Sequence, residues 1–71
     1  MKFILITVKD KKKDYRSLRN IENLLKVTEG DKGVFLQLQY QFPDGGIVRE
    51  DIELNMTFDD VMESLKNPIE V

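Results

Sequence analysis

The chain has 71 residues, the size of one small domain, with no room for a second lobe and a cleft between lobes. Hydrophobic residues make up 41% and charged residues 34%, a globular balance that argues against disorder and fibrous repeats. Histidine and cysteine are absent, which removes the usual general base, the thiolate nucleophile, disulfides and the commonest metal ligands. We therefore predict one cytoplasmic domain, residues 1–71, with no catalytic residues, no metal site and no cofactor.

Charge is distributed unevenly along the chain, although the net charge is only −2. Residues 1–26 carry eight basic and three acidic side chains, a net charge of +5, whereas residues 27–71 carry −7. This asymmetry predicts a dipolar molecule unless folding interleaves the two halves. No apolar run approaches the roughly 20 residues that a membrane-spanning helix needs, so we expect no membrane contact.

The first predicted element is a strand from Phe3 to Val8. It is rich in β-branched residues and apolar on both alternating faces, a pattern typical of a central strand buried on both sides. The six residues that follow, Lys9 to Asp14, are too charged to bury and predict a solvated turn or loop.

Residues 15–29 fit two patterns. Four apolar residues recur at helical spacing behind Ser17, a candidate N-cap: Leu18, Ile21, Leu24 and Leu25. Residues 25–29 alternate as in a strand, and the glycines of the next segment, residues 30–33, supply hairpin turn chemistry. We favour a short helical turn around Ser17 to Ile21 followed by a strand from about Asn23 to Glu29. A helix over residues 17–25 is the alternative.

Two strands, Val34 to Phe42 and Ile47 to Leu54, form the clearest predicted hairpin, joined by the tight turn Pro43-Asp-Gly-Gly46. The segment from Gly33 to Pro43 carries no charge, which is typical of an internal strand but also of a strand that pairs with another chain. The internal strand is the favoured interpretation. The residues of a candidate protein interface here are Phe35, Gln37, Gln39, Gln41 and Glu50.

Glu50 interrupts the pattern of its strand, because period two places it between Val48 and Ile52 on the apolar face. A carboxylate in that position should be paired, lie near an open edge, or be displaced by a β-bulge. Buried carboxylates are uncommon, so we favour the edge or the bulge.

A final helix is predicted from about residue 57 to residue 66. Thr57 can cap it, and Asp60 occupies the third helical position. Four residues form one apolar face, and Asn67-Pro68 ends the helix: Phe58, Val61, Met62 and Leu65. The whole pattern predicts an α+β fold: a small antiparallel sheet of about four strands, curled or flat, with a C-terminal helix packed on it.

A basic segment near the N-terminus is the candidate for nucleic-acid contact. Its cationic side chains can meet phosphates and its tyrosine can stack on a base: Lys11, Lys12, Lys13, Tyr15, Arg16 and Arg19. Asp10 and Asp14 dilute the positive charge, and the isoelectric point near 5.0 is far from that of typical nucleic-acid-binding domains. A solvated loop is therefore the favoured interpretation, and nucleic-acid binding is the alternative.

The order of elements is a strand, a short turn at Leu18 to Ile21, two hairpin strands and a Thr-Phe-Asp-Asp-Val-Met-Glu-Ser-Leu helix. In this layout, over residues 3–66, the chain resembles the small FlbD-type proteins of flagellar operons and similar small bacterial and phage proteins. The lysine loop and the Gln-rich strand are longer here, so no residue roles carry over. The resemblance implies a bacterial or phage accessory protein that acts by contact. We predict a non-enzymatic module that binds a protein partner or a second copy of itself, through an uncharged strand edge or through its charged surfaces.

Overall fold

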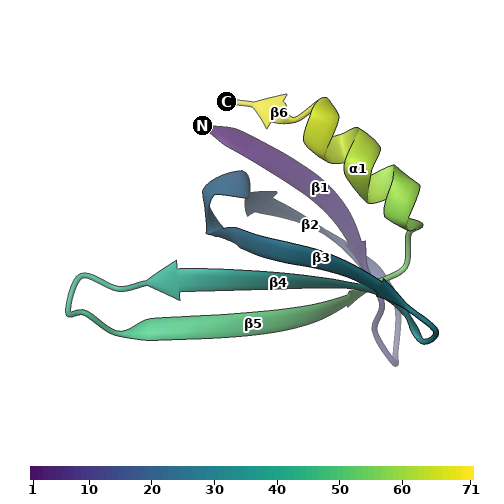
Figure 1. The fold of residues 1–71 in the computed structure, drawn as a ribbon, viewed down its shortest axis with the longest axis horizontal. Helices are drawn as coiled ribbons and strands as arrows, with labels where there is room; N and C mark the ends of the chain where they lie inside the picture. Colours follow the sequence, from purple (N-terminus) through teal and green to yellow (C-terminus); the bar gives the residue numbers. More distant parts are fainter.

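The computed structural model describes residues 1–71 and consists mainly of antiparallel strands (Figure 1). The strands follow the order β2-β1-β5-β4-β3 across the sheet, and a short sixth strand pairs with β1. A single α-helix lies between the fifth and sixth strands in the sequence. The elements are β1 (Lys2–Val8), β2 (Tyr15–Asn20), η1 (Ile21–Asn23), β3 (Leu24–Gly30), β4 (Gly33–Gln41), β5 (Ile47–Leu54), α1 (Phe58–Lys66) and β6 (Ile69–Glu70).

The sheet curls because its two outermost strands, β2 and β3, are joined by only the three residues of η1. This 3₁₀ turn contacts both β1, the neighbour of β2, and β4, the neighbour of β3, so it brings the two ends of the sheet together. Asn20 caps it, since the Glu22 amide donates a hydrogen bond of 3.0 Å to the Asn20 side chain. The result is a partly open barrel with an inner and an outer face.

The core consists of nine buried residues on the inner face, all of them hydrophobic. They come from alternate positions of three strands and from the helix: Ile4, Ile6, Val8, Val34, Leu36, Leu38, Ile52, Leu54 and Val61. Alternation places every second side chain of a strand on one face, so β1, β4 and β5 each contribute a row. Val61 brings α1 into this core, and the helix contacts β1 and β3.

β1 and β5 meet at one end only. Val8 pairs with Leu54, and no other pair joins the two strands. The far end of β1 pairs instead with β6, at Lys2 and Phe3. The two strands therefore diverge from Leu54 toward the start of β5, which leaves β5 without a neighbour on one side for most of its length.

β4 and β5 continue beyond the rest of the sheet as a two-stranded ribbon. Pairing between β3 and β4 ends at Leu38, opposite Leu24, whereas β4 and β5 stay paired as far as Gln41 and Ile47. Figure 1 shows this ribbon and its turn extending to the left of the other strands. The Phe42 amide donates to the Gly46 carbonyl at 2.8 Å and closes the turn.

Several expectations are confirmed: the α+β class, the antiparallel sheet with a C-terminal helix, the central place of the first strand, the long hairpin, and a strand close to residues 23–29. The sheet has six strands rather than about four. The predicted helix is α1, and Thr57 and Asp60 form a reciprocal capping box. The Asp60 amide donates to the Thr57 hydroxyl at 3.0 Å, and the Thr57 amide donates to the Asp60 carboxylate at 3.3 Å.

Two local expectations are wrong. Residues 17–20 are not a helical turn but part of β2, because pairing with β1 satisfies their backbone groups; the turn comes afterwards, capped by Asn20 rather than Ser17. The first strand is buried on one face only, since Leu5 on its outer face is 39% exposed. Leu5 lies opposite Leu18 of β2, which is also exposed, so the apolar outer face of β1 reflects a cross-strand pair rather than burial.

Candidate functional site

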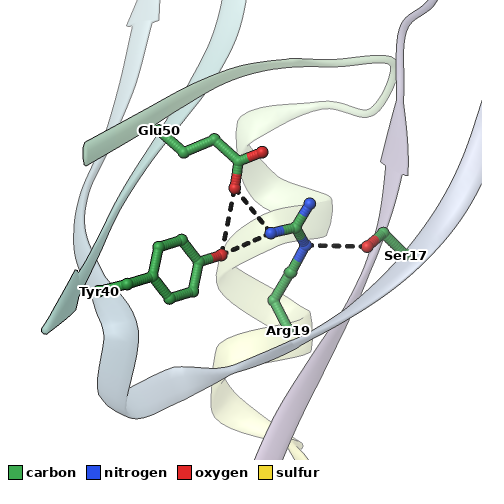
Figure 2. Close-up of polar contacts among 4 residues, drawn as sticks. All are labelled: Ser17, Arg19, Tyr40 and Glu50. Carbon is green, nitrogen blue, oxygen red and sulfur yellow. Dashed lines mark hydrogen bonds and ion pairs between the residues drawn. The ribbon is translucent and has the colours of Figure 1, made fainter. Parts of the chain in front are cut away.

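A polar cluster lies at the open end of the curled sheet, on the same inner face as the apolar core. Its members come from three strands: Ser17 and Arg19 from β2, Tyr40 from β4 and Glu50 from β5 (Figure 2). Arg19 lies opposite Ile4, and Glu50 lies opposite Leu38, so both point inward with the core residues. The inner face of the sheet thus changes from apolar to polar at this end.

Two of the four hydrogen bonds of the cluster end on one carboxylate oxygen of Glu50. Nη1 of Arg19 donates to Oε1 of Glu50 at 2.7 Å and also to the hydroxyl of Tyr40. The Tyr40 hydroxyl donates to the same Oε1 at 3.1 Å, and Nε of Arg19 donates to the Ser17 hydroxyl at 2.9 Å. Figure 2 shows the guanidinium lying between Ser17 on one side and the Tyr40–Glu50 pair on the other.

The electrostatics of the cluster keep Arg19 charged. Burial acts to lower the pKa of the guanidinium, but the hydrogen bond and the negative charge of Glu50, together with Tyr40, outweigh it, so the pKa of Arg19 is raised. The arginine side chain is 22% exposed and the glutamate 41%, so the pair is partly screened by water. The charged Arg19 therefore links the β1–β2 hairpin to the β4–β5 ribbon through its hydrogen bonds to Tyr40 and Glu50.

Glu50 is therefore paired, although it lies on the apolar face of its strand: its partner is Arg19. β5 contains no bulge at this position, since the register shift in the sheet lies in β3, between Leu24 and Lys26. The expected open edge is present, because β5 lacks a second neighbour there. The partner itself, Arg19, was missed, although its alternation with Ser17 and Tyr15 places it on the same face as the core of β1.

The structure does not bring the six residues of the basic segment together. Lys11, Lys12 and Lys13 are exposed in the turn between β1 and β2, where the Asp10 amide donates to the Asp14 carboxylate at 3.1 Å. Arg16 projects from the outer face of β2, and Tyr15, opposite Val8, lies on the inner face. Arg19 is committed to Glu50. The cationic residues of the segment without an ion-pair partner are thus the three exposed lysines and Arg16.

The uncharged strand β4 is internal, as its pattern favours. It lies between β3 and β5, so its backbone edges are occupied over most of its length. Phe35, Gln37, Gln39 and Gln41 lie on its outer face, opposite the face that carries Glu50. Gln37 donates to Asp51 at 3.0 Å, and Arg49 donates to Gln39 at the same distance. The glutamine row therefore joins β4 to β5 and does not form an edge.

The free edge is on β5. The carbonyl of Glu53 accepts a hydrogen bond of 2.9 Å from the Lys9 amide across this edge. Backbone groups of an antiparallel strand alternate between its two neighbours, so Ile47, Arg49 and Asp51 direct their amides and carbonyls toward the same side. No strand meets them there. We name the segment Ile47–Asp51 the β5 edge.

Exposed apolar side chains surround the β5 edge. Ile47 is 59% exposed and Val48 is 48% exposed, and Phe42 at the ribbon turn is also exposed. Of the other two outer strands, β3 has a bulge beside Lys26, which discourages strand pairing, and β2 carries the inward-pointing charge of Arg19, as β5 carries that of Glu50. The β5 edge has no bulge, lysine or proline, its inward-pointing Glu50 is already paired with Arg19, and its backbone groups are unpaired, so it is open to pairing with another strand.

A shallow cavity of about 510 Å³ lies at the opposite end of the sheet, between the β3–β4 turn and the start of α1. Charges of both signs line it, and Lys9 pairs with Glu53 across 3.3 Å. Its Thr57 and Asp60 side chains are engaged in the helix cap. Nowhere in the chain do three or more acidic side chains gather as a metal-binding group, and α1 is too short and too polar to span a membrane.

Comparison of this chain with protein-family models, with curated proteins and with solved structures gave no match.

Proposed function

We propose that this chain is a small protein-interaction module that binds an extended segment of its partner by strand addition to the β5 edge. The observation that supports this is the row of outward-directed backbone groups at Ile47, Arg49 and Asp51, flanked by exposed Val48 and Ile47 side chains. In strand addition, main-chain hydrogen bonds supply affinity and alternate side chains supply specificity. The absence of cysteine, which favours a reducing compartment, makes the cytoplasm our proposed location.

The arrangement around the edge also supports binding rather than catalysis. The one cluster of interacting titratable side chains at the mouth of the sheet is a closed ion pair, in which Arg19 stays protonated and Glu50 accepts two hydrogen bonds. A general acid or base must exchange a proton with substrate, which an arginine with a raised pKa does not do near pH 7. We therefore assign the cluster a positioning role: it links β5 to β2 through side chains on the inner face, while the backbone groups of the β5 edge stay unpaired.

Selection of peptides from a random display library tests this function without knowledge of the natural partner. We expect selected peptides to show period-two alternation, as an added strand requires. A Val48→Lys substitution should weaken their binding at least about tenfold, equivalent to about 1.4 kcal/mol, because a lysine protects a strand edge. Leu25→Lys is the matched control, since Leu25 is 48% exposed, the same as Val48, and lies on β3.

Two results would contradict the proposal. One is a set of selected peptides whose binding is equally sensitive to both substitutions or to neither. The other is salt-sensitive binding of single-stranded or double-stranded nucleic acid that survives Val48→Lys but is lost when Lys11, Lys12 and Lys13 are changed to glutamine. That second result would support the nucleic-acid alternative.

A further inference from the structure

We propose that the segment which adds to the β5 edge is the β5 edge of a second copy, in an antiparallel pair whose two-fold axis passes beside Val48. This inference rests on the proposed function, because it names the partner of the same edge. Two identical edges that run antiparallel present the same donors and acceptors to each other, so a symmetric pair satisfies both copies at once. The resulting sheet is continuous from β4 of one copy to β4 of the other.

Geometry restricts where the axis can lie. Residues directly opposite each other in an antiparallel pair point to the same face, so a two-fold axis must pass beside a residue and not between two residues. The outward-directed groups belong to Ile47, Arg49 and Asp51. Three registers therefore pair these outward-directed groups of one copy with those of the other, with the axis beside Val48, Arg49 or Glu50.

Charge and space exclude two of the three registers. An axis beside Arg49 puts the two Arg49 side chains directly opposite each other, and an axis beside Glu50 does the same with two carboxylates; like charges in such positions are destabilising. The Glu50 register also brings Ile47 of the second copy opposite Glu53, whose carbonyl already accepts from Lys9. The Val48 register places no like charges opposite each other.

The Val48 register also covers the exposed apolar surface. On the inner face, Val48 lies opposite Val48 of the second copy, and each has Tyr40 on its other side, since Tyr40 pairs with Val48 within the ribbon. On the outer face, Ile47 lies opposite Arg49 of the second copy, whose aliphatic stem can cover it. Each Ile47–Arg49 pair can exchange both backbone hydrogen bonds. The contact is small, so we expect a weak, concentration-dependent dimer.

Sedimentation equilibrium tests the stoichiometry. The weight-average mass of the wild type should rise from 8.3 kDa toward twice that value between about 1 µM and 1 mM. Val48→Lys should keep the mass at 8.3 kDa over this range, because it places two ammonium groups opposite each other. Leu25→Lys should behave as the wild type. Val48 is half exposed, so circular dichroism should show that all three proteins are folded.

Cysteine cross-linking tests the register, and the chain has no native cysteine to interfere. In the Val48 register the two residues 48 form a non-hydrogen-bonded pair with their Cα atoms about 4.5 Å apart, within the range that a disulfide needs. Val48→Cys should therefore give a disulfide-linked dimer under mild oxidation. Arg49→Cys is the neighbouring control: its two copies are offset by two residues along the strands, too far apart to bridge. Leu25→Cys controls for random collisions.

A wild type that stays monomeric at 1 mM, or equal cross-linking of the Val48, Arg49 and Leu25 cysteine variants, would overturn the dimer. Faster cross-linking through Arg49→Cys than through Val48→Cys would overturn this register. If the wild type is monomeric but Val48→Lys still abolishes peptide binding, self-pairing fails while strand addition to another protein stands. If the dimer forms in the Val48 register but no peptide is selected, self-association is the use of this edge and hetero-recognition fails.

Discussion

Removal of the charge of Glu50 is the most direct test of the tie between the two halves of the sheet. Glu50→Gln keeps an oxygen acceptor in place but loses the ionic part of the contact with Arg19, whose Nη1 lies 2.7 Å from Oε1. A hydrogen bond to a charged group contributes about 1.5–3 kcal/mol when it is well shielded. Because the Glu50 side chain is 41% exposed, screening reduces this, and we expect a loss of about 1 kcal/mol in the free energy of unfolding.

Urea denaturation monitored by circular dichroism measures this loss, and for a domain of this size it corresponds to a decrease of about 4–8 °C in Tm. Glu53→Gln is the control, because Glu53 pairs at 3.3 Å with Lys9, which is far more exposed than Arg19. We expect that control to lose no more than about 0.5 kcal/mol. Equal losses for the two variants would refute the reasoning that the inward pair holds β2 to β5.

A double-mutant cycle separates the pair from its surroundings. Arg19→Met and Glu50→Gln, alone and together, should give a coupling energy of about 1 kcal/mol between positions 19 and 50. The coupling should decrease at high salt, since partly exposed charges are screened. A coupling indistinguishable from zero would mean that Arg19 contributes only through its other contacts, the hydrogen bonds to Tyr40 and Ser17.

Two further stability predictions concern local structure, each measured by urea denaturation. Thr57→Ala removes the acceptor of the Asp60 amide and should cost about 1 kcal/mol, whereas an unchanged stability would mean that the capping box contributes nothing to the docking of α1. Gly45 has φ +92°, so Gly45→Ala should cost about 1 kcal/mol or more, while Gly30→Ala, where an added Cβ meets nothing within 4 Å, should be neutral or slightly stabilising. Equal effects of the two glycine substitutions would contradict the assignment of strain to the ribbon turn.

Local patterns in the sequence predicted the elements whose formation depends on their own residues. The β4–β5 hairpin follows from strict alternation and two turn glycines, and α1 follows from Thr57, Asp60 and an apolar face that includes Val61. These predictions hold in the structure because the hairpin and the capped helix are each built from residues that are neighbours in the sequence. The same signals place both termini of α1 within a residue of where the structure has them.

β2 was missed because its inner face is polar. Tyr15, Ser17 and Arg19 take the positions that apolar residues occupy in the other strands, so the period-two signal is absent and the helical spacing of Leu18 and Ile21 dominates. Pairing with β1 overrides that spacing. The residue that hides the strand in the sequence, Arg19, is also the partner of Glu50, so one tertiary contact accounts for both departures from the pattern.

The open edge could not be located from the sequence either, because strand order is a tertiary property. The absence of charge in β4 makes that strand a candidate for pairing with another chain, but β4 is enclosed by β3 and β5. The edge belongs to β5, which carries Arg49 and Asp51 and so has the sequence of an ordinary solvated strand. Its charges lie flat against Gln39 and Gln37 of β4, which leaves its outward backbone groups uncovered.

The polar cluster and the open edge have a common origin. Along β5 the apolar core ends at Ile52, and the next inner position is taken by Glu50, opposite Leu38; on β2 the inner position opposite Ile4 is taken by Arg19. A hydrated ion pair offers no apolar surface that would draw β1 onto β5, so the two strands diverge beyond Val8 and Leu54. Arg19 bridges the opening with its side chain instead of its backbone. An ion pair thus takes the place of hydrophobic packing at the open end of the sheet. It links the two sides through side chains, and it leaves the backbone groups of the β5 edge free to accept a strand.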